Sequence, residues 1–245
     1  MSDTRLYTDA PLAPGEAVAL RNDRARYVSR VLRLRPDDVV TLFDGRGAEY
    51  PARITALSKD RVLLTVDERR EVDRESLLRI HLLQGISRGE RMDFAVQKAT
   101  ELGVARMTPV LTEYSVVKLN EKRAEKKTQH WQAIAASACE QCGRNVLPVV
   151  EPPIKLRNWM GEHHTAKGKR IVLQPGSNTA VSDIGEPVDE ITVLVGPEGG
   201  FSDTEYELAA ACHFQAVGFG PRILRTETAA AAILTALQTL YGDLG

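Results

Sequence analysis

The chain has 245 residues, with 32 Lys or Arg against 33 Asp or Glu, and a net charge of −1. This length provides core for one large domain or two small ones, and the balanced charge leaves nucleic-acid binding to local clusters. No run approaches the ~18 apolar residues of a membrane span, and the polar first ten residues lack the apolar core of a signal peptide. Three cysteines do not make a disulfide scaffold, which fits a reducing compartment. Together with the absence of a long apolar run, this leads us to expect a cytoplasmic protein without membrane contact.

Residues 1–72 are expected to form a small β-barrel. Three short apolar runs are separated by turn sequences, and they span residues 39–43, 50–57 and 62–66. Short strands at this spacing are typical of small barrels. The charged run 68–75 has no apolar periodicity and is predicted to link this domain to a second one, residues 76–245.

One helical pattern, residues 23–34, interrupts these strands. Its apolar residues share a broad face and comprise Tyr27, Val28, Val31, Leu32 and Leu34. Six arginines lie within fifteen residues, beside the single acid Asp23. Such a cluster is either a solvated helix face or a surface that binds phosphate oxygens. The candidates for phosphate contact are Arg21, Arg26, Arg30 and Arg33.

From residue 76 onward, strand patterns alternate with helix patterns. Strands are predicted at 79–85, 107–111, 170–175 and 191–195, and helices at 90–102 and 120–143. The run 191–195 is largely apolar and β-branched and carries no charge, which indicates a strand buried on both faces of a parallel sheet. The second domain is therefore predicted to be α/β.

Two glycine-containing turns follow late strands of this domain. Residues 196–201 precede Ser202 and Glu205, which have the spacing of a capping box at a helix start. Residues 216–220 form a short strand, 221–225 a loop, and 226–241 a helix with one apolar stripe. Because open α/β sheets bind ligands at strand ends, these two turns form the candidate active site.

The first turn lacks the Gly-Lys-Ser/Thr of a P-loop, and it follows a late strand, unlike the dinucleotide fingerprint. Backbone groups and apolar contacts suit a ligand such as an adenosine moiety. Cys139 and Cys142 form a C-x-x-C late in a long helix, where packing is expected and no metal site is predicted. No nucleophile-elbow glycines flank Ser87 or Ser115, which leaves a hydrolase triad without support.

The two turns resemble those of the bacterial small-subunit ribosomal RNA methyltransferase E family. The similarity lies in Gly-Pro-Glu-Gly-Gly-Phe-Ser at 196–202 and in Gly-Pro-Arg-Ile-Leu-Arg-Thr-Glu-Thr-Ala at 220–229, and it extends to 97–104 and 140–144. Nearly the whole chain is covered. In this chain Tyr114 stands where the family usually has an arginine, and Cys142 where it has a serine.

This resemblance implies a PUA-like barrel, then a SPOUT-type parallel-sheet methyltransferase domain with a C-terminal trefoil knot. It implies S-adenosylmethionine as cofactor, a homodimer, and N3-methylation of a decoding-region uridine near the 3′ end of 16S ribosomal RNA in the small subunit. The expected cofactor-binding residues are Leu173, Gln174, Val195, Gly196, Glu198, Gly199, Gly200, Ile223, Leu224 and Thr226. The expected catalytic residues are Arg144, Glu198, Arg225 and Glu227.

Three points stay open from the sequence. The proton acceptor at uracil N3 could be Glu198, Glu227 or Glu140, while Arg144 or Arg225 could stabilise the negative charge that forms. A module that binds RNA or the ribosome without catalysis is one alternative, and a methyltransferase acting on ribose 2′-hydroxyls is another. Whether free RNA suffices as substrate is the third.

Overall fold

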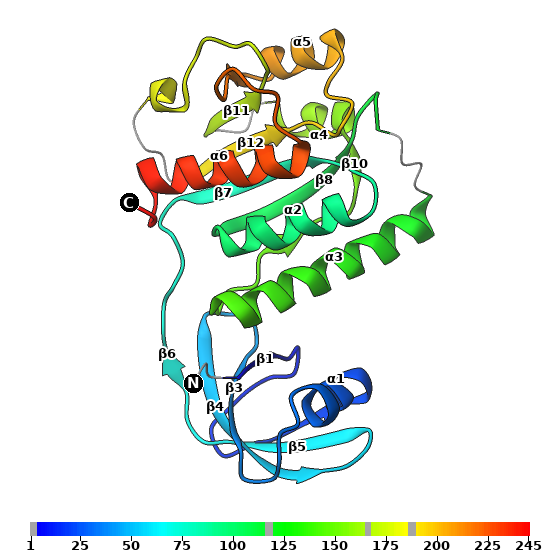
Figure 1. Ribbon diagram of the computed structural model, residues 1–245, viewed down its shortest axis with the longest axis vertical. Helices are drawn as coiled ribbons and strands as arrows, with labels where there is room; N and C mark the ends of the chain where they lie inside the picture. The colour runs from blue at the N-terminus through cyan, green and yellow to red at the C-terminus, as the bar shows by residue number, and fades with distance from the viewer. Residues whose placement is uncertain (1–3, 116–119, 165–167, 186–189) are drawn as a thin grey trace. The chain divides into compact units, whose positions relative to one another are not determined.

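The computed structural model describes residues 4–115, 120–164, 168–185 and 190–245. The chain forms two compact units, Met1–Glu75 with Cys139–Leu147 and Ser76–Ala138 with Pro148–Gly245 (Figure 1). Cys139–Leu147 was expected within the second domain, 76–245, but it belongs to the first unit. Leu147 donates its N–H to the Gly45 carbonyl at 3.1 Å, and Asn145 donates to the Val72 carbonyl at 2.8 Å. These pairings join residues far apart in sequence, which local patterns do not reveal.

The first unit is built on a six-stranded sheet. Its strands are β1 (Arg5–Tyr7), β2 (Ala17–Arg21), β3 (Val39–Phe43), β4 (Ala48–Leu57), β5 (Arg61–Val66) and β6 (Arg70–Glu71). They lie in the order β1-β3-β4-β5-β2, with β6 paired to β4. All pairs are antiparallel except β1 with β3.

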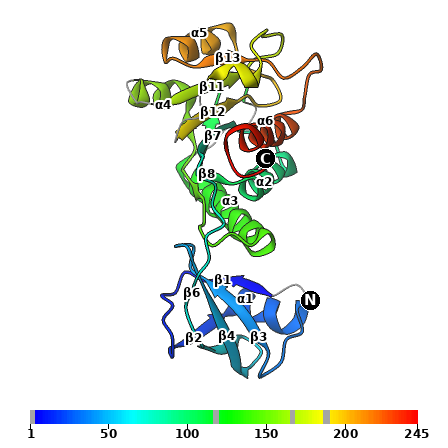
Figure 2. The ribbon, with the colours of Figure 1, turned by 90° about the vertical axis from the view of Figure 1, so that its left-hand side faces the viewer.

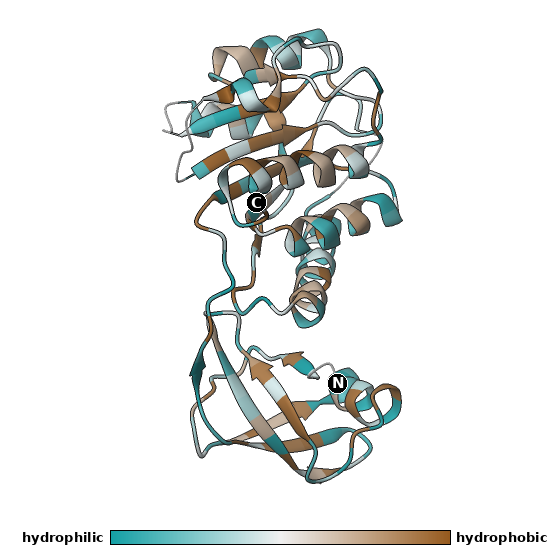
Figure 3. Cartoon of the chain, turned by 60° about the vertical axis from the view of Figure 1, so that its left-hand side comes forward, coloured by the Kyte–Doolittle hydropathy of each residue, from teal (hydrophilic) through white to brown (hydrophobic). Residues whose placement is uncertain are grey.

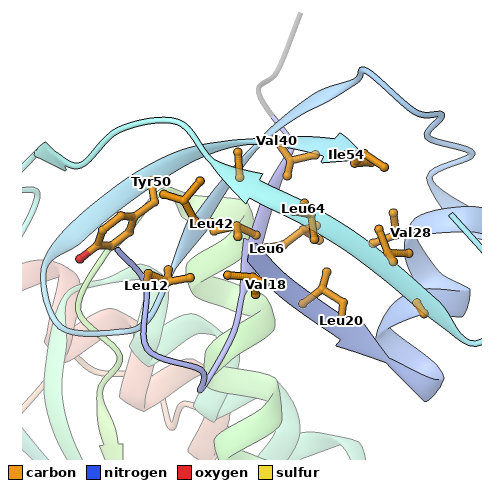
Figure 4. Packing of buried hydrophobic residues seen from close by; sticks show 14 of the residues in the cluster. Leu6, Leu12, Val18, Leu20, Val28, Val40, Leu42, Tyr50, Ile54 and Leu64 are labelled. Carbon is orange, nitrogen blue, oxygen red and sulfur yellow. The ribbon is translucent and has the colours of Figure 1, made fainter. Parts of the chain in front are cut away.

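One core fills this unit. Side chains from β1 to β5 point into it, as Figure 4 shows for Leu6, Leu20, Leu42, Ile54 and Leu64. Along β5 buried residues alternate with exposed or half-buried ones, because successive side chains of a strand point to opposite faces. The apolar runs of residues 39–66 therefore lie in strands, as predicted.

The predicted helix 23–34 is shorter and less regular. An α-helix, α1 (Asn22–Arg26), passes into a π-helical turn, η1 (Tyr27–Val31), closed by the Leu32 N–H bonding to the Tyr27 carbonyl at 3.0 Å. The wider turn shifts the side chains that follow. Val28 is fully buried, but Tyr27 and Val31 are 38% and 66% exposed, so the expected apolar face is wrong at these two positions.

The predicted linker 68–75 is also partly structured. Its residues Arg70 and Glu71 form β6 on the edge of β4, and Arg74 pairs with Glu49 at 3.0 Å. Opposite charges far apart in sequence hold the segment in place, and a search for apolar periodicity misses them.

The second unit is a parallel α/β sheet. Its strands are β7 (Arg79–Gly85), β8 (Val104–Leu111), β9 (Val149–Val150), β10 (Ile154–Lys155), β11 (Lys169–Leu173), β12 (Glu190–Val195) and β13 (Gln215–Val217). The order is β10-β8-β7-β12-β11-β13, with β9 also on β8, and each of these pairs is parallel.

Helices cover both faces of this sheet. The helices of this unit are α2 (Glu90–Glu101), α4 (Leu156–His163), α5 (Asp203–Ala211), α6 (Thr226–Tyr241), the short 3₁₀ helix η2 (Val181–Ile184) and α3 (Glu121–Cys142), whose last residues, from Cys139 on, belong to the first unit. Figure 2 shows α2 and α6 on one side of the strands and α4 and α5 on the other. The strands are largely hydrophobic (Figure 3), and every residue of β12 after Glu190 is buried, which confirms the predicted parallel sheet.

The helix α6 runs over the predicted residues 226–241. Ala230, Ile233, Leu234 and Leu237 are buried, whereas Leu240, expected on the same stripe, is 48% exposed. The buried Gln238 instead donates to the Leu102 carbonyl at 3.1 Å and accepts from Ser76 Oγ at 2.7 Å. The buried face of α6 therefore includes one polar side chain, Gln238, whose amide nitrogen and oxygen are both hydrogen-bonded.

Candidate active site

A cavity of about 760 Å³ lies in the second unit, where β11, β12 and β13 end and α6 begins. Its walls are the ends of these strands, the 196–201 turn and the 219–225 loop. This is the position in which open α/β sheets bind ligands. Such a volume lies within the ~300–1,000 Å³ of small-molecule sites.

Most residues predicted to bind a cofactor line this cavity. They are Leu173, Gln174, Val195, Gly196, Glu198, Gly200, Ile223, Leu224 and Thr226. Arg225 and Glu227, predicted to be catalytic, line it as well. Gly199 is the predicted residue that does not, because it turns toward Tyr114: a Cβ built on it would lie 2.8 Å from the Tyr114 Cβ.

The 196–201 turn is fixed by its own hydrogen bonds and by α5. Gly200 donates its N–H to the Pro197 carbonyl at 2.9 Å and has φ +70°, a conformation that favours glycine. Ser202 and Glu205 form the predicted capping box, with the Ser202 N–H bonding to Glu205 Oε2 at 3.0 Å. The turn is therefore held in place before any ligand binds.

Gly85, at the end of β7, supports this turn from behind. A Cβ at Gly85 would lie 2.3 Å from the Pro197 nitrogen, 2.5 Å from its Cδ and 2.7 Å from the Gly196 carbonyl carbon. Only a glycine permits this approach. Sequence reasoning missed Gly85, since the turn that it contacts is more than a hundred positions further along the chain.

A second support joins β7, β12 and α6. Gln84 is fully buried and donates to Thr226 Oγ1 at 2.9 Å, while that hydroxyl donates to the Gly196 carbonyl at 2.5 Å. The first residue of α6 is thus bonded to the first residue of the glycine turn. Thr226 was predicted to contact the cofactor, whereas no local pattern points to Gln84.

Glu198 points its carboxylate toward two arginines of the 88–91 segment. Its Oε1 accepts from Arg91 Nη1 at 2.8 Å and from the Arg88 N–H at 3.2 Å. Burial acts to raise the pKa of Glu198, but hydrogen bonds from its own N–H, from Arg91 and from Arg88 outweigh it and hold this pKa below its ordinary value. An ion-paired carboxylate of lowered pKa is a poor proton acceptor.

Glu227 differs from Glu198. Its Oε2 is buried, and across the described ranges no group donates a hydrogen bond to it. A buried polar atom without a partner is costly, so this oxygen is available to a donor that enters the cavity. Arg225, two residues earlier, is exposed and also borders the cavity.

Arg144 and Glu140 belong to the first unit, and neither is among the residues that line the cavity. Arg144 is 4% exposed and ion-paired with Glu75. Glu140 accepts from Arg24 Nη2 at 2.6 Å and from the Tyr7 N–H at 2.8 Å. Both side chains are engaged in holding Cys139–Leu147 on the barrel, and a part for either in the reaction stays a prediction.

The cysteines of the C-x-x-C motif are free thiols. Burial raises the pKa of Cys139 to about 12, which makes it unreactive at neutral pH. Within the described residues, no three His, Cys, Asp or Glu side chains are grouped as metal ligands would be. Over the same residues, no helix is long and apolar enough to cross a membrane.

Arginines of the 21–35 cluster differ in their partners. Arg26 is ion-paired with Asp60 at 2.9 Å and with Asp23 at 3.4 Å, so its charge is largely balanced. Arg21, Arg30 and Arg33 are exposed. The sequence pattern groups Arg26 with the other arginines. It does not reveal that Asp60, which is distant in sequence, lies beside Arg26 in the fold.

Several cavity residues were not predicted. Those with large side chains include Arg91, Phe201, Tyr206, Phe219 and Arg222. Phe201 and Tyr206 pack edge to face, with ring centroids 5.4 Å apart. The glycine-rich context of residues 196–201 and 218–222 was the available signal for Phe201, Phe219 and Arg222, whereas Arg91 and Tyr206 reach the cavity from helices.

Two family models match this chain. The RNA methyltransferase domain matches residues 74–238, and the RNA methyltransferase PUA domain matches residues 20–67. Among curated proteins, the ribosomal RNA small subunit methyltransferase E of Buchnera aphidicola from Acyrthosiphon pisum is 34% identical over 98% of this chain and 94% of its own length. The protein of the same name from Bacillus subtilis is 29% identical over 92% of each.

Two solved structures are similar over nearly the full length. A methyltransferase from Legionella pneumophila, in complex with the bound cofactor SAM, has a TM-score of 0.95 and 38% identity and covers 100% of both chains. The small subunit methyltransferase E from Neisseria gonorrhoeae, bound to S-adenosyl methionine, has a TM-score of 0.90 and 40% identity over 99% of this chain and 100% of that one. From these matches and from the motifs at 196–202 and 220–229, the chain belongs to the ribosomal RNA small subunit methyltransferase E family.

Proposed function

We propose that this chain uses S-adenosylmethionine to methylate N3 of a uridine in 16S ribosomal RNA. The target is a decoding-region uridine near the 3′ end, reached in the assembled small subunit in the cytoplasm. The observation that carries the proposal is the cavity at the ends of β11, β12 and β13, bordered by both motifs of the family. Relatives named for ribosomal RNA methylation and neighbours solved with S-adenosylmethionine support it.

The residues present are suited to this cofactor. Leu173, Val195 and Leu224 offer apolar walls to an adenosine, and the glycine turn offers backbone groups. The partnerless Glu227 oxygen can balance a positive charge. When bound, S-adenosylmethionine supplies a methyl group on a sulfonium. We include the trefoil knot in the proposal, supported by the convergence of residues 173–176, 195–201 and 217–227 on one cavity.

In the proposed reaction, a residue of this chain must remove the proton from uracil N3. Uracil N3 is a nucleophile only after its proton has left. Among the three candidate acceptors, Glu140 bonds to Arg24 and Glu198 to Arg91, which leaves Glu227 with a buried oxygen that accepts from no described residue. We therefore assign the proton to Glu227.

Loss of that proton spreads negative charge onto the uracil carbonyl oxygens. Arg225 lines the cavity two residues before Glu227, and Arg91 lines it beside Glu198. Guanidinium groups that face a developing oxyanion in a water-poor site stabilise it strongly. Arg225 is the better candidate, because the Arg91 charge is already shared with Glu198.

The direct test is to incubate the protein with labelled S-adenosylmethionine and small subunits that lack the modification. The methylated nucleoside is then identified by mass. N3-methyluridine is the expected product. A 2′-O-methyl nucleoside would favour the ribose methyltransferase, and binding to subunits without any transfer would favour the non-catalytic module.

The first unit is proposed to supply RNA affinity through Arg21, Arg30 and Arg33. Replacing Arg30 and Arg33 by Gln should weaken binding to small subunits and reduce the slope of log K against log salt by about 1.4, because each phosphate that is no longer neutralised lowers this slope by ~0.7. Binding at several salt concentrations measures the slope. Arg157→Gln, an exposed arginine of α4, is the matched control and should leave it unchanged. An unaltered slope in the double variant would mean that the arginine face is only solvated.

We also propose a homodimer whose interface includes α6. Thr235, Thr239 and Leu240 are exposed on this helix without any charge, and Ala231 and Ala232 leave room for close approach. Gln238, which is also uncharged, is buried within the unit and is not part of this face. A neutral exposed helix face is suited to burial against a second copy.

Ala232→Arg should convert the dimer to a monomer, because a long charged side chain would enter the proposed interface. Light scattering at micromolar concentration measures the mass of each form. The matched control is Ala133→Arg on an exposed position of α3, which should stay dimeric. A monomeric wild type, or a fully dimeric Ala232→Arg protein, would remove α6 from the interface.

A further inference from the structure

Tyr114 lies in a built turn that follows β8. The Thr112 N–H donates to Ser115 Oγ at 2.9 Å, and the Ser115 N–H donates to the Thr112 carbonyl at 3.1 Å. The Glu113 N–H bonds to Glu205 Oε1 at 2.9 Å, while the other Glu205 oxygen caps α5. One carboxylate thus ties the Tyr114 turn to the helix that starts directly after the glycine turn.

Tyr114 touches the glycine turn through its Cβ and backbone. A Cβ built on Gly199 would lie 2.8 Å from the Tyr114 Cβ and 3.4 Å from its carbonyl oxygen, against 3.7 Å for its Cγ. Glu198 and Gly200, on either side of Gly199, both line the cavity. The start of the Tyr114 side chain is therefore fixed next to the cavity wall.

The ring itself is not covered by this contact. Tyr114 is 50% exposed, although burying the apolar faces of a tyrosine ring lowers the free energy. Anchored at its base and half-exposed, Tyr114 is an aromatic residue beside Gly199, whose neighbours Glu198 and Gly200 line the cavity. Bases that leave an RNA stack are commonly received on such aromatic faces.

We propose that the ring of Tyr114 is the surface on which an unstacked pyrimidine base of the RNA substrate stacks as it enters the site. The inference rests on the proposed methyltransferase function and adds a substrate-contacting residue to it. A neutral ring face holds a base through stacking and apolar contact, which leaves the hydrogen-bonding edge of the base free.

The decisive variant is Tyr114→Ala, which keeps the Cβ that meets Gly199 and removes only the ring. We expect kcat/KM for small subunits to fall by about 5- to 150-fold, mostly through KM, the range that corresponds to ~1–3 kcal/mol per stacked base. Calorimetric affinity for S-adenosylmethionine should stay at the wild-type value. Tyr114→Phe should retain activity, because its ring still stacks without the hydroxyl.

Phe94→Ala is the matched control, since Phe94 is an aromatic residue of similar exposure, 45%, on α2 and outside the cavity lining. Its kcat/KM should not change. Wild-type activity in Tyr114→Ala would overturn the inference, and so would an equal loss of cofactor affinity, which would make Tyr114 a support for the turn. A wild type that methylates no RNA would instead contradict the proposed function itself.

Discussion

Replacing Glu227 by Gln is expected to lower kcat for RNA methylation by about 10²–10⁴-fold, the usual contribution of a positioned general base. The amide has the shape of the carboxylate, so α6 and the cavity should keep their form. Its nitrogen and oxygen cannot take the N3 proton at neutral pH. Single-turnover methyl transfer to small subunits measures the effect apart from product release.

Glu198→Gln is the matched control, because Glu198 lines the same cavity but carries a hydrogen bond from Arg91. An amide oxygen can still accept from Arg91 and from the Arg88 N–H, so we expect a change in kcat of less than about tenfold. If instead Glu198→Gln abolished turnover and Glu227→Gln left it intact, Glu198 would be the acceptor despite its lowered pKa.

The parts of the fold that could be predicted from the sequence are those that local patterns determine. β12 is buried and largely apolar from Ile191 onward because helices cover both faces of the sheet, and α6 shows one apolar stripe because it covers only one face. The capping box at Ser202 and Glu205 depends on a spacing of three residues. Each of these features can be recognised within a short window of the sequence.

The parts that were missed depend on pairs distant in sequence. Arg144 and Glu75 are 69 positions apart, and no local pattern predicts their ion pair within the first unit, while a catalytic part for Arg144 stays a prediction. Asp60 balances Arg26 from 34 positions away. Charge alone could not separate the exposed arginines proposed to bind RNA from those that pair within the chain.

The candidate site shows the same division between features that local patterns reveal and features that depend on distant residues. Both motifs border the cavity because strand ends of a parallel sheet meet at one edge. Gly85, Gln84 and Tyr114 lie on other strands or turns and reach the 196–201 segment or α6 only through the folded sheet. Their residue types carry no signal, since a lone glycine or glutamine at a strand end is ordinary.

Gly85→Ala is expected to weaken S-adenosylmethionine binding by about 100-fold or more. The added Cβ would fall 2.3 Å from the Pro197 nitrogen and 2.7 Å from the Gly196 carbonyl carbon, so the glycine turn must move. A displaced turn no longer presents its backbone groups to the cofactor, and a 100-fold loss corresponds to about 2.8 kcal/mol of binding free energy. Overpacking one methyl group costs ~1–3 kcal/mol, which leaves the protein folded but less stable to heat. Calorimetry and thermal unfolding measure the two effects separately.

The control is Gly161→Ala, the same substitution in α4, where the new Cβ has no atom within 4 Å apart from its chain neighbours and the backbone of its own helix. Alanine is favoured over glycine inside a helix, so this variant should gain ~0.5–1 kcal/mol of stability and bind the cofactor normally. Both variants add one methyl group. A difference in their cofactor affinity therefore reports the effect of the close contact between Gly85 and the glycine turn. Wild-type affinity in Gly85→Ala would mean that the turn can shift without cost, and that its preformed position does not determine cofactor binding.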